Sequence, residues 1–111
     1  MNYDKEIILI KEVVAEYFKL TPDVFTTKGR KGRIPEARRI AIIIANELFA
    51  EITYAELSVY FYPNMDHTTI IYARRKIKDD CETIMGYRAK FNEVAKSCEK
   101  AISTLNKEYY N

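Results

Sequence analysis

The sequence has 111 residues and a net charge of +2, and 48% of its residues are hydrophobic. This length fits one domain with a single modest core, and the hydrophobic content excludes a disordered chain. No apolar run approaches the roughly 18 residues of a membrane span, and the first residues do not form a signal peptide, so we expect a cytoplasmic protein. Because Cys81 and Cys98 are far apart and there is one histidine, we expect free thiols and no metal.

The first half of the chain predicts three helices. Residues 3–18 carry apolar side chains at helical spacing. Thr21, Pro22 and Asp23 are typical of a helix start, and a short second helix is expected there. Pro35 fits the first turn of a third helix, which buries isoleucines and ends near Leu48.

The next two helices have the spacing of a helix-turn-helix. Thr53 and Glu56 form a capping box, so a fourth helix should run to about residue 61. Residues 62–65 read Tyr-Pro-Asn-Met, which is typical of a turn. Asp66 is expected to cap a fifth helix that buries Ile70, Ala73 and Ile77. Helix, four-residue turn and capped helix together predict a helix-turn-helix.

From Cys81 to Tyr109 the sequence predicts one long sixth helix. Its apolar stripe recurs every seven residues at Ile84, Phe91, Cys98 and Leu105. We favour packing of this stripe on the domain, and a dimer seam is the alternative. The expected organisation is all-α, with a DNA-binding unit at residues 1–80 and a C-terminal helix at residues 81–111 that packs on it or mediates self-association.

Positive charge is concentrated between residues 28 and 39, where six basic residues accompany one acid, Glu36. The six are Lys28, Arg30, Lys31, Arg33, Arg38 and Arg39. A solvated charged loop is the usual fate of such a run. Here the charge is nearly of one sign, and glycines loosen the first part, so we expect an arm that can reach a DNA minor groove.

The start of the fifth helix is the candidate reading head. Asp66, His67, Thr68 and Thr69 are small polar residues at a helix N-terminus, where side chains can meet base edges. Arg75 and its basic neighbours can reach phosphate. Local pairing with Asp79 and Asp80 is the alternative, but only some of these basic residues can be paired in that way. Adjacent residues point in different directions, so a catalytic triad of Asp66, His67 and Thr68 is disfavoured. No glycine-rich loop for a nucleotide is present, and neither an enzyme nor a cofactor is expected.

These residues resemble a known family. Asp66-His67-Thr68-Thr69, followed by Ile70, Ala73 and Arg75-Lys76-Ile77, is similar to the signature of the C-terminal DNA-binding domain (domain IV) of the bacterial replication initiator DnaA. The segments 14–23, 28–33 and 38–48 are also similar to that domain, so the resemblance spans about residues 10–78. It implies a Trp-repressor-like all-α fold that binds double-stranded DNA at DnaA-box-like sites in replication or transcription control, associated with the nucleoid.

The resemblance also implies roles by position. Asp66, His67 and Thr68 would face base edges in the major groove, and Thr69 would contact phosphate or a base. Arg30 would enter the minor groove, and Arg38 would contact a base or the backbone. Arg39, which stands where the family usually has glutamine, would hold phosphate.

Several positions depart from the family pattern. The turn at residues 62–65 is one residue longer than the family's and lacks its basic residue, and Glu36 and Asn46 replace basic residues. The docking angle and preferred site are therefore expected to differ. The resemblance covers no ATPase domain, so we expect a stand-alone DNA-binding domain with an added C-terminal helix. The alternative hypothesis is a protein-interaction module that kept the fold and acts through that helix.

Overall fold

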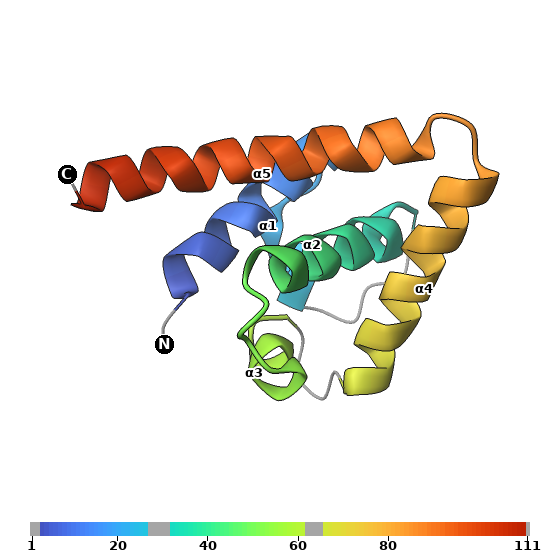
Figure 1. Ribbon diagram of the computed structural model, residues 1–111, viewed down its shortest axis with the longest axis horizontal. Coiled ribbons are helices and arrows are strands. Elements are labelled where there is room, and N and C mark those ends of the chain that lie inside the picture. The colour runs from blue at the N-terminus through green and yellow to red at the C-terminus, as the bar shows by residue number, and fades with distance from the viewer. Residues whose placement is uncertain (1–2, 27–31, 62–65, 111) are drawn as a thin grey trace.

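A computed structural model describes residues 3–26, 32–61 and 66–110, and all regular structure in these ranges is helical. Within these ranges, five α-helices and one 3-10 helix follow each other in sequence (Figure 1). Their bounds are α1 Asp4–Phe18, η1 Pro22–Thr26, α2 Ile34–Leu48, α3 Tyr54–Val59, α4 His67–Thr83 and α5 Tyr87–Tyr110. The predicted all-α class is confirmed. The predicted count of six helices is corrected, because the second is a 3-10 helix of five residues.

Helix α2 forms the centre of the core. It is buried from Ala37 to Asn46 apart from Arg39, because isoleucines and alanines occupy seven of these ten positions. Helix α1 contributes Ile7, Ile10 and Val14 to the same core. In Figure 1, α5 lies across α1 and α2, whereas α4 runs down one side and α3 lies at the opposite end of the molecule from α5.

The prediction of one helix from residue 81 onward is wrong. Helix α4 continues through Thr83, and α5 begins only at Tyr87. Ile84 is extended, with φ −108° and ψ 118°, and Gly86 has a φ of +81°, a value that glycine reaches without strain. The chain therefore turns a corner at residues 84–86, and the expected division between residues 80 and 81 falls inside α4.

The middle of the C-terminal apolar stripe packs within the chain. Tyr87, Phe91, Val94 and Cys98 all belong to the hydrophobic core. Helix α5 lies against α1, α2 and α4, which brings the two ends of the chain into one unit. Burial raises the pKa of the Cys98 thiol to about 12, so this cysteine remains a neutral core residue.

Candidate nucleic-acid interface

The N-terminus of α4 is fixed by Asp66. Its Oδ1 accepts hydrogen bonds from the backbone N–H groups of Thr68, at 2.9 Å, and Thr69, at 3.2 Å, and from the Thr68 hydroxyl. These bonds, with that of the Thr68 hydroxyl first, lower the pKa of the Asp66 carboxyl. The structure therefore has the N-cap that the sequence predicts, and an ionised carboxylate stands at the exposed tip of the helix.

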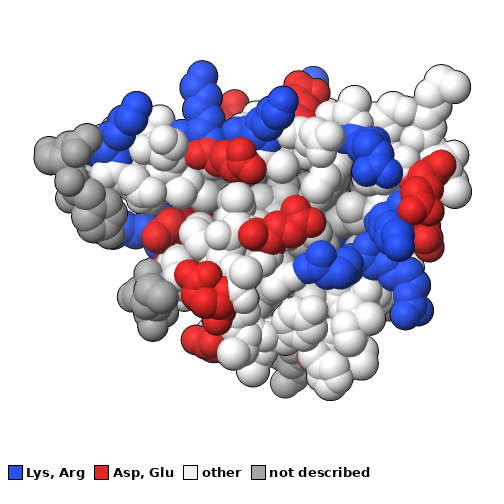
Figure 2. All heavy atoms as spheres, in the orientation of Figure 1, with Lys and Arg blue, Asp and Glu red and all other residues white. Residues whose placement is uncertain are grey.

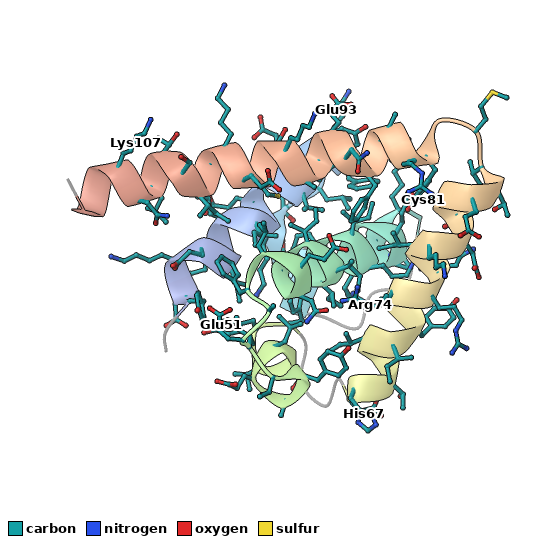
Figure 3. All side chains as sticks on the ribbon, in the orientation of Figure 1. Glu51, His67, Arg74, Cys81, Glu93 and Lys107 are labelled. Carbon is teal, nitrogen blue, oxygen red and sulfur yellow. The ribbon has the colours of Figure 1, made fainter. Side chains whose placement is uncertain are left out.

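The outer face of α4 carries a mixed polar and apolar surface. His67, Thr68 and Arg75 are exposed, and Thr69 is half-buried. Figure 3 shows His67 at the free end of α4, pointing away from the other helices. Ile70, Ala73 and Ile77 face the core, as the 3.6-residue period predicts.

Two further exposed residues of α4 were not among the predicted contacts. Ile71 is 43% exposed and Tyr72 is 59% exposed, one turn after His67 and Thr68. Apolar side chains at such positions can meet thymine methyl groups. The helical period contained this signal, because residues 67, 68, 71, 72 and 75 share one face of a helix.

Helix α3 supports α4 and is secured at both ends. At its start, the Thr53 side chain accepts from the Glu56 N–H at 3.1 Å, and Glu56 accepts from the Thr53 N–H at 3.0 Å. At its end, the Lys11 ammonium of α1 donates to the Tyr60 carbonyl and lies 5.0 Å from the centre of the Phe61 ring. Burial lowers the pKa of Lys11. No local pattern indicated this lysine, because its partner is 49 residues away.

The predicted basic run is only partly described. Lys28, Arg30 and Lys31, like the turn at residues 62–65, lie outside the described residues. Arg33 is exposed beside the N-terminus of α2, with its guanidinium 5.9 Å from the Phe18 ring centre.

The side chains of Arg38 and Arg39 are less exposed than that of Arg33. Arg38 is 8% exposed, and its Nη2 donates to the Val24 carbonyl at 3.0 Å, which ties η1 to α2. Arg39 is half-buried. Within the described part of the basic run, Arg33 is therefore the cation most open to a ligand.

The basic residues of α4 divide into paired and open side chains. Arg74 donates to the Asn46 side chain and lies 3.9 Å from a Glu47 carboxylate oxygen. Lys76 pairs with Asp80 at 3.1 Å. Arg75 and Lys78 are exposed and form no ion pair with another described residue. Of the predicted DNA contacts on α4, Arg75 therefore remains open to phosphate.

No group in the described ranges, 3–26, 32–61 and 66–110, brings three His, Cys, Asp or Glu residues together to hold a metal. No helix within those ranges is long and apolar enough to cross a membrane. The site consists instead of a capped helix, its polar tip and open cations beside it. A short supporting helix followed by such an exposed helix defines the class of helix-turn-helix DNA-binding domains.

Comparison with known proteins gives the family. Residues 7–77 match the family described as "Bacterial dnaA protein helix-turn-helix", and the chain belongs to it. It is similar to the chromosomal replication initiator protein DnaA of Corynebacterium jeikeium strain K411, at 35% identity over 101 residues. The DnaA of Bacteroides fragilis strain YCH46 is 29% identical over 89 residues. No solved structure matches the chain.

These alignments cover most of this chain but only a small part of each relative. The Corynebacterium jeikeium alignment covers 89% of this chain and 16% of the relative, and the Bacteroides fragilis alignment covers 77% and 17%. The chain therefore spans about a sixth of the length of these relatives. At 89% of the chain, the first alignment continues past residue 77 into the C-terminal part that contains α5.

Proposed function

We propose that this domain binds a specific duplex site, with the tip of α4 in the major groove. The observation that carries this proposal is the arrangement of α4, in which Asp66 fixes the first turn while His67 and Thr68 are exposed. Asp66 uses Oδ1 for its capping bonds, which leaves Oδ2 to accept from a cytosine amino group. His67, Thr68 and Ile71 provide donors and apolar surface for base edges and thymine methyl groups.

Phosphate contacts position this reading head. Arg75 and Thr69 suit the strand beside the major groove, and Arg33 suits the backbone near the adjacent groove. The segment with Lys28, Arg30 and Lys31 is proposed to reach the minor groove, as the family resemblance implies. Arg39 is proposed as an additional phosphate contact at its half-buried position, whereas Arg38 holds η1.

The relatives are named as chromosomal replication initiators, so a role at DnaA-box-like sites in replication or transcription control is the corresponding proposal for this chain. The domain would then act without catalysis or nucleotide, in the cytoplasm at the nucleoid. The longer turn at residues 62–65 is expected to change the preferred site. A homodimer through the C-terminal helix remains part of the proposal, because Leu105 near the end of the apolar stripe of α5 is only half-buried.

Selection of bound duplexes from a random library tests the proposal and yields the site. About six phosphate contacts predict a slope of about −5 for log affinity against log salt concentration. His67→Ala should reduce discrimination between the selected site and random duplex by about 1–3 kcal/mol, while nonspecific binding persists. Lys96→Ala, at an exposed position of α5, is the matched control. Failure to enrich any duplex at low salt would contradict DNA binding and favour the interaction-module alternative.

A further inference from the structure

A hollow of about 410 Å³ lies where α2, α4 and α5 meet. Its floor includes Ile43, Ile77 and Phe91, one apolar residue from each helix. These three side chains are counted in the hydrophobic core, so the hollow reaches down to core surface. Surface depressions with an apolar floor are typical of binding sites rather than of solvated faces.

The rim of this hollow carries three basic residues and one acid, Glu47. Arg74 and Lys78 come from α4 and Arg88 comes from α5. Arg74 is engaged with Asn46 and Glu47, whereas Lys78 and Arg88 are exposed and have no ion-pair partner among the described residues. Figure 2 shows blue side chains gathered over α4 and the start of α5, on the right of the view. The rim therefore presents two open cations beside an apolar surface.

The hollow is separate from the proposed reading head. Lys78 lies ten residues after Thr68, which is about 15 Å along a helix axis. The floor residues of α2 and α5 place the opening on the flank of α4 against which these helices pack, not at its tip. In Figure 3, Cys81 and Arg74 mark this region, and His67 is at the far end of α4.

We infer that this hollow binds an acidic peptide segment of a partner protein, one that carries a leucine or phenylalanine between carboxylates. The carboxylates pair with Lys78 and Arg88, and the apolar side chain covers the floor formed by Ile43, Ile77 and Phe91. A DNA backbone fits less well, since phosphates gain nothing from an apolar floor. The peptide and the duplex contact different parts of α4, so both can bind the domain at the same time.

Cys81 provides a direct footprint, because it lines the hollow and is partly exposed. The probe is a short synthetic peptide in which glutamates flank a single leucine, added to the full chain with and without a duplex. Iodoacetamide alkylation of Cys81 is followed by mass spectrometry. Cys98 is the internal control, because it is buried and its thiol pKa is raised to about 12. The peptide should slow alkylation of Cys81 and leave Cys98 unreacted.

Two sets of variants test the chemistry. Reversing charge with Lys78→Glu and Arg88→Glu should weaken the peptide's protection of Cys81 at least about tenfold, because each carboxylate then meets a like charge. Lys96→Glu, an exposed change elsewhere on α5, should not alter it. A peptide with serine in place of leucine should protect much less.

Three outcomes would overturn the inference. The first is no protection by the peptide at low salt. The second is equal loss of protection in the Lys96→Glu control, which would indicate general charge attraction. The third is protection of Cys81 by duplex alone, with a salt slope that falls in Arg88→Glu, which would make the hollow a DNA contact.

Discussion

Replacing Lys11 with methionine should loosen the helix-turn-helix without touching its DNA-facing residues. Methionine keeps most of the apolar stem of lysine but removes the ammonium that donates to the Tyr60 carbonyl and lies over the Phe61 ring. Helix α3 has only six residues and depends on contacts at its two ends. Its C-terminal anchor comes from α1, so this variant tests whether distant packing positions the reading head.

The expected loss can be worked from these contacts. A hydrogen bond to a charged group is worth about 1.5–3 kcal/mol and a cation over a ring about 0.5–1 kcal/mol. The burial that lowers the pKa of Lys11 opposes them, and partial solvent exposure screens both. We therefore expect Lys11→Met to lower the free energy of unfolding by about 1 kcal/mol.

Urea denaturation measures that loss, and its pH dependence gives a second check. The pKa of Lys11 is 10.5 in the unfolded chain and lower in the folded protein, so the unfolded state binds more protons between those values. The Lys11 contribution to the unfolding free energy therefore rises with pH in that window. Above about pH 10, the Tyr60 contribution to the unfolding free energy falls as the pH rises, because the pKa of Tyr60 is raised in the folded state. Unchanged stability and unchanged site discrimination in Lys11→Met would refute this reasoning.

Three further predictions separate structural from DNA-contacting groups. The pKa of Asp66 is lowered from 3.8 in the folded protein, so its stabilising contribution is present above that value and is lost as the pH falls through the folded pKa. Asn at position 66 keeps an N-cap without a titrating group, so the unfolding free energy of Asp66→Asn should depend less on acid pH than that of the wild type. Parallel pH profiles of the two proteins would contradict this prediction. Arg38→Met should cost about 1–3 kcal/mol of stability because the hydrogen bond from the guanidinium to the Val24 carbonyl is lost, with the salt slope of DNA binding unchanged. Arg75→Ala should leave stability unchanged and reduce the steepness of the slope of log affinity against log salt concentration by about 1, as DNA titrations at several salt concentrations would show.

Local sequence signals predicted much of the fold. The capping box of Thr53 and Glu56 and the N-cap at Asp66 appear in the structure as expected, because each depends on residues within one turn. Pro35 lies in the first turn of α2, where its missing N–H has no cost. The helical period also identified the buried face of α4.

The errors came from tertiary context. The heptad pattern through Ile84 predicted continuous helix, but the chain turns at Gly86 so that Tyr87 can enter the core. Charge and the family resemblance marked Arg38 as a DNA contact, which stays a prediction; neither indicated that its guanidinium donates to a carbonyl of η1 14 residues away. Lys11 meets Tyr60 across 49 residues, and a single sequence has no local signal for such a pair.

Glu36 shows how a departure from the family pattern can be structural. Glu36 occupies a position at which the family usually has a basic residue, and this substitution suggests that a DNA contact is lost. In the structure it pairs with Lys90 of α5 at 3.0 Å, and the same ammonium lies 4.9 Å from the Phe18 ring centre. Both partners are largely sheltered from solvent, and Glu36 follows burial as a cause of the raised pKa of Tyr87. The first turn of α2 therefore has an acidic residue in place of a basic one, and that residue holds α5 through its ion pair with Lys90. Because Arg33 precedes the same turn, α5 braces the part of the domain from which the proposed minor-groove arm extends.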